Sequence, residues 1–186
     1  MLFAPKIHTM RKLIAFIAAT VFVTGAWAQT YEGAFTQTKT IKASGRTIVS
    51  KGNLTYTAPD QLSMLYTSPE GDYMIIDGPY MRSDLNGTAV DVDTSKNAQM
   101  RNLRNTLLNC IAGDVETVAK ENDADLVSKP KSGGGRTVTL TARRQAARGY
   151  SKIVLEYRAD GVLTSMIMEE FGGVSTEMKF SNIKKL

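Results

Sequence analysis

Few side chains in this sequence could carry out covalent chemistry. The only histidine is His8 and the only cysteine is Cys110. Serine and cysteine nucleophiles usually depend on a histidine base, and a catalytic zinc ion usually needs three protein ligands. Glu169 and Glu170 are adjacent on a predicted strand, so their carboxylates point to opposite faces and form a poor catalytic pair. The sequence therefore offers little for an enzyme such as a lipid hydrolase.

One segment partly matches a calcium-binding loop. Residues 91–97 space two aspartates, a serine and an asparagine as the first ligands of such a loop are spaced. The sixth position, which should be glycine, is Lys96, and the twelfth, which should be glutamate, is Asn102. We therefore expect no metal ion, and we expect no other cofactor.

The first 28 residues have the three zones of a cleavable secretory signal peptide. Arg11 and Lys12 precede a short apolar run at residues 13–25, and Ala26-Trp27-Ala28 offers the pattern that signal peptidase cuts. The run is shorter than the roughly 20 apolar residues of a membrane-spanning helix. We expect cleavage before Gln29, no transmembrane span, and a soluble protein outside the cytoplasm.

Cleavage would change the chemistry that is available. It removes His8, and it removes three basic residues and no acid, which lowers the formal net charge from +5 to +2. A chain so close to neutral is not typical of a nucleic-acid-binding protein. Residues 29–186 have the size of one domain, and their single cysteine allows no internal disulfide.

From Gln29 onward apolar and polar residues mostly alternate, which indicates strands with one buried face. Asn86-Gly87 is a strong hairpin signal because both residues tolerate positive φ. The predicted strands are 31–42, 47–57, 62–66, 73–76, 80–84, 90–92, 126–129, 137–142, 151–158, 162–171 and 175–183.

The period becomes helical in the middle of the chain. Residues 96–112 predict an amphipathic helix with Ser95 as its N-cap and Gly113 just after its end, and residues 114–122 predict a second, short helix. So many consecutive strands in one domain predict a mainly β fold. We expect a large antiparallel sheet curled into an open β-barrel or half-shell, covered by a lid of one or two helices.

The stretch 52–78 has a distinctive pattern. A Gly-x-Leu-x-Tyr strand starts at Gly52, a Leu-x-x-x-Tyr strand follows a proline turn, and an apolar strand after a second proline turn ends in Asp77-Gly78. Phe35-Thr36-Gln37 lies upstream. This pattern resembles the periplasmic outer-membrane lipoprotein carrier family, the LolA-like proteins of Gram-negative bacteria, and the order of elements is similar over most of residues 29–186.

The resemblance implies a periplasmic carrier that does no covalent chemistry. Its hydrophobic cavity would take up the acyl chains of a lipoprotein from the inner-membrane lipoprotein-release ABC transporter complex and deliver them to the outer-membrane acceptor. That acceptor is anchored through a lipidated cysteine at its cleavage site. Gln29 at this position favours a soluble shuttle instead.

Two features depart from the family pattern. Family members usually carry a helix before the Phe-x-Gln strand, whereas only residues 29–34 separate the predicted cleavage site from Phe35, so we expect that helix to be missing. They also carry an arginine just before the first turn proline, which holds the lid shut. Ala58 occupies that position, so we expect the lid to be held differently.

The resemblance implies that one face of the strands lines an acyl-chain cavity, for which methionine is well suited because it is unbranched and polarizable. The cavity candidates are Leu54, Tyr56, Leu62, Met64, Tyr66, Met166 and Met168, and the lid candidates are Met100, Leu103, Leu107 and Ile111. The same alternation also fits an ordinary hydrophobic core. A register shift of one residue would turn the other face inward.

A second function on the same fold stays open, which is a soluble periplasmic sensor that binds lipid or lipoprotein without carrying it. A carrier should engage the inner-membrane release complex, whereas a sensor should engage a regulatory protein.

Overall fold

The structure is a computed structural model that describes residues 29–145 and 149–186. The predicted signal peptide, residues 1–28, lies outside the described residues. Among the described helices, none is long and apolar enough to cross a membrane.

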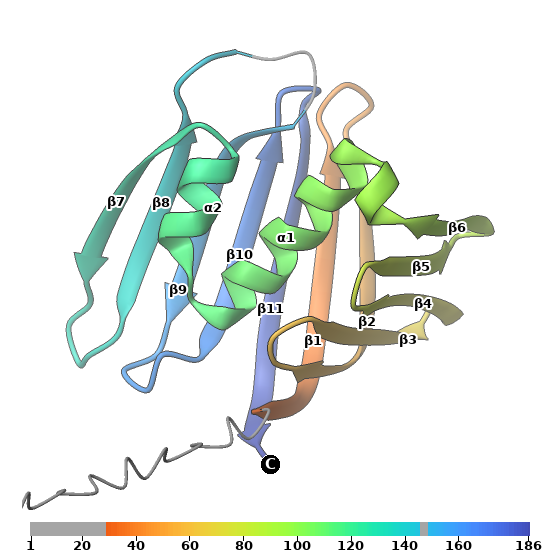
Figure 1. Ribbon diagram of the computed structural model, residues 1–186, viewed down its shortest axis with the longest axis horizontal. Helices are drawn as coiled ribbons and strands as arrows, with labels where there is room; N and C mark the ends of the chain where they lie inside the picture. Colours follow the sequence, from red (N-terminus) through yellow and green to blue (C-terminus); the bar gives the residue numbers. More distant parts are fainter. Residues whose placement is uncertain (1–28, 146–148) are drawn as a thin grey trace, which may run out of the picture.

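One antiparallel sheet of eleven strands dominates the fold (Figure 1). In β3, Leu62, Met64 and Tyr66 are buried while Gln61 and Leu65 are exposed, as the alternation predicted. The strands are β1 (Thr30–Ile41), β2 (Arg46–Thr57), β3 (Gln61–Ser68), β4 (Glu70–Asp77), β5 (Tyr80–Leu85), β6 (Thr88–Asp93), β7 (Ala124–Pro130), β8 (Arg136–Ala142), β9 (Tyr150–Tyr157), β10 (Leu163–Glu170) and β11 (Val174–Lys185).

The first and last strands lie side by side near the middle of the sheet. The strand order is β6-β5-β4-β3-β2-β1-β11-β10-β9-β8-β7, so β1 pairs with β2 on one side and with β11 on the other. β6 and β7 follow each other in the chain, but they form the two opposite edges of the sheet. The segment that connects them must travel from one edge to the other.

That connection consists of a 3-10 turn, η1 (Thr94–Lys96), and two helices, α1 (Ala98–Ala112) and α2 (Val115–Glu121). The prediction that Ser95 caps the first helix is wrong. Ser95 lies within η1, and extended backbone at Asn97 separates this turn from α1. Asn97 is the N-cap, since its side chain accepts a hydrogen bond from the Met100 N–H at 3.1 Å.

The end of α1 is as predicted. Gly113 has a left-handed backbone with φ of 81°, which a residue without a Cβ adopts at little cost. This turn redirects the chain into α2, so the two helices form a continuous cover.

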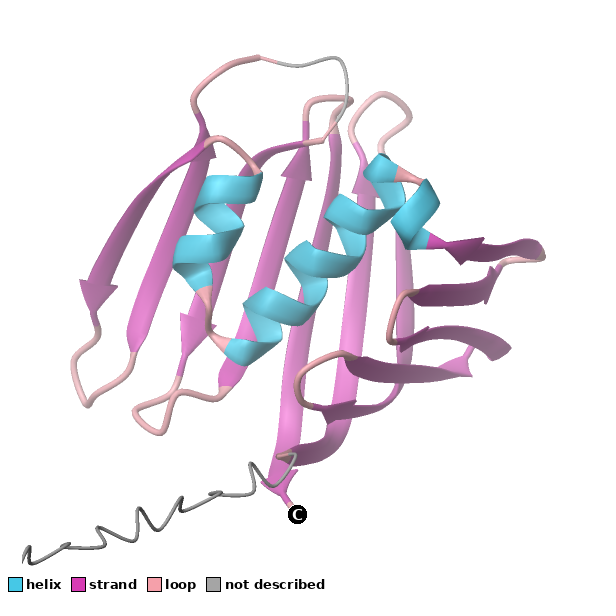
Figure 2. Ribbon diagram, in the orientation of Figure 1, coloured by secondary structure: helices cyan, strands magenta, loops and turns pink. Residues whose placement is uncertain are grey.

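Both helices lie over the concave face of the curled sheet (Figure 2). α1 crosses this face diagonally, from near β6 to the lower ends of β9 and β10, and α2 lies in front of β8 (Figure 1). Buried side chains from the sheet and from both helices form a single hydrophobic cluster. The predicted fold class, an open barrel of antiparallel strands with a helical lid, is confirmed.

Candidate functional site

All seven residues predicted to line a cavity are buried in the core between the sheet and the helices. The β2–β3 register places Leu54 opposite Met64 and Tyr56 opposite Leu62. Met166 and Met168 come from β10, which is separated from β2 by β1 and β11. The curled sheet brings the two groups into one hydrophobic cluster.

Methionine is concentrated in this core. The strand pairing places Met74 opposite Met64 and Met178 opposite Met166, although neither Met74 nor Met178 was among the predicted cavity residues. Their alternation with Ile76 and Phe180 was a usable signal in the sequence. All the methionines of residues 29–186 belong to the core or pack against it, namely Met64, Met74, Met81, Met100, Met166, Met168 and Met178.

The four predicted lid residues all lie on α1. Leu107 is fully buried, and Met100, Leu103 and Ile111 are partly buried and pack against the core. The buried side of the helix is broader than the predicted apolar stripe, because it also includes Thr106 and Leu108.

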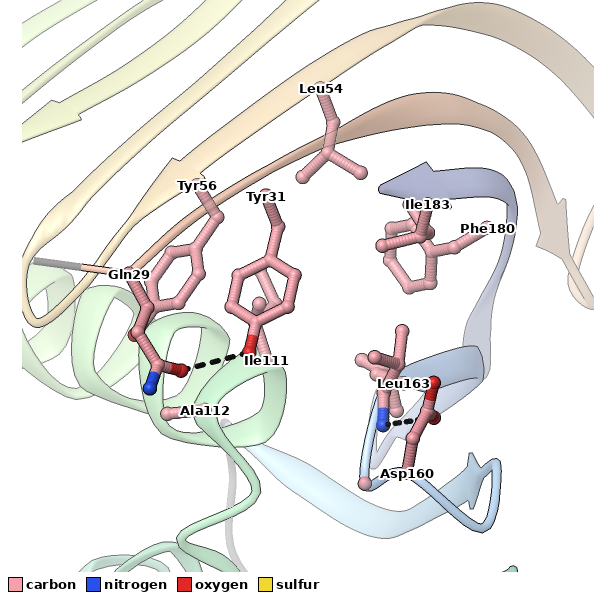
Figure 3. A pocket seen from close by; sticks show the side chains of 12 residues that line it. Gln29, Tyr31, Leu54, Tyr56, Ile111, Ala112, Asp160, Leu163, Phe180 and Ile183 are labelled. Atoms are coloured by element: carbon pink, nitrogen blue, oxygen red, sulfur yellow. Dashed lines mark hydrogen bonds between the residues drawn. The ribbon is translucent and has the colours of Figure 1, made fainter. Parts of the chain in front are cut away.

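A pocket of about 240 Å³ lies at the C-terminal end of α1 (Figure 3). The helix contributes one side, the central strands β1, β2 and β11 contribute another, and the turn between β9 and β10 completes it. Leu54, Tyr56, Leu163 and Phe180 belong both to the pocket and to the core. The lining residues are Gln29, Tyr31, Leu54, Tyr56, Ile111, Ala112, Asp160, Gly161, Val162, Leu163, Phe180 and Ile183.

Of the predicted residues, Leu54, Tyr56 and Ile111 line this pocket, and the other eight belong to the core or pack against it. Sequence reasoning did not select Tyr31 or the β11 residues of the pocket. No local signal could have placed them together, because β1 and β11 meet only when the two ends of the chain pair.

The pocket has an apolar wall and a polar rim. The rings of Tyr31 and Tyr56 stack with their centroids 6.4 Å apart, and the Tyr31 hydroxyl donates to Gln29 Oε1 at 2.9 Å. On the opposite side, Asp160 accepts a hydrogen bond from the Val162 N–H at 3.2 Å (Figure 3). Asp160 also forms an ion pair with Arg158 at 2.6 Å. Such a site suits a ligand with an apolar body and a polar end.

The residues of the distinctive sequence pattern pack on one another beside this core. The Phe35 and Tyr66 rings meet edge to face, with centroids 5.0 Å apart. Gly52 leaves room for the Phe35 ring, since a Cβ at this position would lie 2.7 Å from two of its carbons. The Tyr66 hydroxyl donates to Gln37 Oε1 at 3.1 Å. The pattern therefore specifies how β1, β2 and β3 pack.

Side-chain hydrogen bonds tie α1 to the sheet at two places. Near its middle, Arg104 Nε donates to the carbonyl oxygen of Gly78, in the turn between β4 and β5, at 2.6 Å. At its end, the Tyr157 hydroxyl donates to the Cys110 carbonyl at 2.7 Å, and an Arg136 Nη donates to the Gly113 carbonyl at 3.3 Å.

Ala58, which replaces the arginine expected from the family pattern, packs against the core. Its N–H donates to the Gln29 carbonyl at 2.9 Å. In this protein α1 itself carries the arginine that ties it to the sheet, since Arg104 donates to the Gly78 carbonyl between β4 and β5.

Burial keeps the titratable groups of the core uncharged. Desolvation raises the pKa of Tyr56, and it raises the pKa of Tyr66 and of the Cys110 thiol to about 12. Burial likewise raises the pKa values of Tyr150 and Tyr157. A thiol with such a pKa is not a nucleophile at neutral pH. Residues 29–145 and 149–186 contain no group of three or more His, Cys, Asp or Glu that could hold a metal ion.

Several solved structures are similar to this chain. A LolA superfamily protein from Nitrosomonas europaea is 10% identical, with 83% of this chain and 85% of that chain covered and a TM-score of 0.38. A DUF1329 family protein from Desulfovibrio piger is 13% identical (86% and 86% covered, TM-score 0.41). The lipoprotein LppX from Mycobacterium tuberculosis is 11% identical (82% and 85% covered, TM-score 0.37).

No curated protein sequence matches the chain. A protein-family model described as outer membrane lipoprotein carrier protein LolA, however, matches residues 26–186. Because this match covers the whole of the described sheet and both helices, the chain belongs to the LolA family.

Proposed function

We propose that this protein is a periplasmic carrier that binds the acyl chains of lipoproteins in the apolar space beneath α1 and moves them from the inner to the outer membrane. The observation that carries the proposal is the pocket at the end of α1, whose walls are continuous with the methionine-rich core. Membership in a family of lipoprotein carriers supports the same function.

The physical basis of binding is transfer of an acyl chain from water to this core. Each methylene that is buried contributes about 0.8 kcal/mol, so ten methylenes would contribute about 8 kcal/mol without any polar recognition. The core residues are packed together with α1 in place, so a long chain requires α1 to move away from the sheet. Methionine side chains can then repack around acyl chains of different shape.

The proposal includes no catalytic step and no cofactor. It includes cleavage of residues 1–28 as a signal peptide, which leaves residues 29–186 as a single carrier domain with Gln29 at its N-terminus. The proposed partners are acylated lipoproteins, the inner-membrane lipoprotein-release ABC transporter complex and an outer-membrane acceptor.

A spheroplast release assay tests the proposal directly. The full chain is expressed in Gram-negative cells, the exported protein is purified, and it is added to spheroplasts that synthesise a triacylated lipoprotein. We expect the lipoprotein to appear in the soluble fraction in a complex with the protein. If none is released, the protein is not a carrier.

A matched pair of variants tests the site. Ile111→Gln places an amide in the pocket and should lower the affinity for a fluorescent fatty acid by about tenfold or more, since an unpaired polar group is costly in an apolar site. Val127→Gln changes an exposed apolar residue on β7 and should have no effect. Fatty-acid binding without lipoprotein release would favour the sensor over the carrier.

A further inference from the structure

One end of the sheet differs in charge from the rest of the molecule. Residues 61–93, which form β3 to β6 and are here named the acidic wing, contain six carboxylates and one basic residue, Arg82. The remainder of residues 29–186 contains nineteen lysines and arginines and twelve acids. The wing therefore has a concentrated negative charge on a protein that is otherwise basic.

Several of these carboxylates lie on the outer face of the wing, away from the helices. Met81 and Ser83 of β5 are buried, so their neighbours Tyr80, Arg82 and Asp84 point outward. Pairing places Tyr80 beside Asp77 and Asp93, and Arg82 beside Asp91. The outer face thus carries acids among aromatic and apolar side chains, with Arg82 as its one basic residue.

Little within the described part of the chain neutralises this face. Asp93 is the one wing carboxylate with an ion pair there, to Lys96 at 3.3 Å. Asp84 Oδ1 is buried and has no hydrogen-bond partner among the described residues. Leu65 and Tyr80 expose 51% and 53% of their surface, so the wing also offers apolar contact area.

The wing ends in an open strand edge. β6 is the last strand of the sheet, and neither helix covers its outer side (Figure 1). The Thr94 N–H donates to the Pro79 carbonyl at 2.9 Å. Along β6, every second residue counted back from Thr94 therefore directs its backbone N–H and C=O groups towards β5. The backbone groups of Ala89 and Asp91 therefore point away from β5 and are available to another strand.

The opposite edge is less available. α2 packs beside β7, and β7 ends in Pro130, which has no N–H to donate to a further strand. The Arg143 guanidinium also pairs with Asp125 of β7 at 2.7 Å. The two edges of the sheet are thus not equivalent.

We propose that the acidic wing is a docking surface for a basic, extended segment of a partner protein, which adds to the sheet as a strand beside β6. Backbone hydrogen bonds to Ala89 and Asp91 would position the segment. Its lysines or arginines would lie next to Asp91 of β6, with Asp84 and Tyr80 one strand further in on β5, where Tyr80 would supply apolar contact. Opposite charge would also accelerate the encounter.

The charge of the wing argues against two other occupants. A second copy that paired β6 with β6 would bring the acids of two wings together, and an anionic lipid surface would be repelled by them. The outer face of the wing is also on the other side of the sheet from the pocket. The docking surface can therefore be tested without reference to lipid binding.

The test uses the exported protein and a synthetic peptide, Lys-Val-Lys-Thr-Lys-Val-Lys, with blocked ends. We expect the peptide to bind, the affinity to fall as salt is raised, and hydrogen exchange to slow at the Ala89 and Asp91 amides. A peptide with glutamate in place of each lysine is the charge control. It should not bind.

Two variants assign the surface. Ala89→Pro removes an outward-facing N–H, and an edge strand tolerates this change. In this variant the peptide should no longer slow hydrogen exchange at the Asp91 amide. Asp91→Asn should weaken binding about threefold, as expected for one exposed charge pair, whereas Asp125→Asn on β7 is the matched control and should not. Unchanged peptide binding by both wing variants, protection on β7, or dimerisation of the protein through β6 would each overturn the proposal.

Discussion

Gly52 is a single residue on which the packing of three strands depends. In Gly52→Ala the new Cβ would lie 2.7 Å from the Phe35 ring and would also clash with the Leu65 carbonyl oxygen. We expect the free energy of unfolding to fall by about 1–3 kcal/mol, measured by urea denaturation. Gly172→Ala is the control, because a Cβ there meets no atom within 4 Å. Equal stability of the two variants would contradict this account of the sequence pattern.

Tyr157 is the residue that ties the end of α1 to β9. Its hydroxyl donates to the Cys110 carbonyl in a buried hydrogen bond, and the same carbonyl also accepts from the Gly113 N–H at 3.3 Å. Tyr157→Phe should therefore cost only about 1 kcal/mol, because one partner of the carbonyl remains. The measurement is again urea denaturation, with Tyr80→Phe at an exposed position as the control. A loss as small as that of the control would show that this hydrogen bond contributes nothing.

At the scale of elements, the two helices are linked to each other as well as to the sheet. Asn105 Nδ2 donates to Glu121 Oε1 at 3.0 Å, and Asn122 Nδ2 donates to Thr106 Oγ1 at 3.1 Å. We therefore expect α1 and α2 to move together when the concave face opens. The contact between Arg104 and Gly78 is then the tie that must break on the β4–β5 side.

Cys110 lies on the buried side of α1, and its thiol is fully shielded from solvent. Its reactivity therefore reports how often the helix moves away from the sheet. We expect Arg104→Ala to speed modification of Cys110 by a thiol reagent, several-fold relative to the unaltered protein. Arg101→Ala is the matched control, since Arg101 donates to the Ser95 carbonyl in η1, just before the same helix, and not to the sheet. Stability measured in urea separates local opening from unfolding. Equal rates in the two variants would mean that Arg104 does not hold the helix.

For the molecule as a whole, the buried tyrosines and thiol make stability sensitive to alkali. The pKa rises to about 12 for Tyr66, from 10.0, and for Cys110, from 9.0. The folded protein keeps these protons after the unfolded chain has lost them. The contribution of these groups to the free energy of unfolding is therefore fully present below about pH 9 and is lost as the pH rises towards 12.

The expected result is an unfolding free energy that is constant near neutral pH and declines above about pH 9, with tyrosine ionisation accompanying unfolding in the ultraviolet spectrum. Cys110→Ala removes the first of these groups, so its decline should begin about one pH unit higher. A stability that does not change up to pH 12 would show that these groups titrate equally in both states.

The sequence by itself determined which segments are strands and which are helices. Alternation along β2 and β3 depends on neighbouring residues only, as does the left-handed turn at Gly113 that ends α1. The same local patterns identified the apolar residues of the core, including Leu62, Met64 and Met166, because burial follows the period of each element.

The tertiary structure alone decided where those faces meet. The pocket forms because β1 pairs with β11 across most of the chain length, which places Tyr31 near Phe180 and Ile183 and under Ile111 of α1. The same pairing makes β6 an edge, so that a run of acids becomes a charged surface with free backbone groups. Such contacts join residues far apart in sequence, and no local period encodes which distant strand a given strand will pair with.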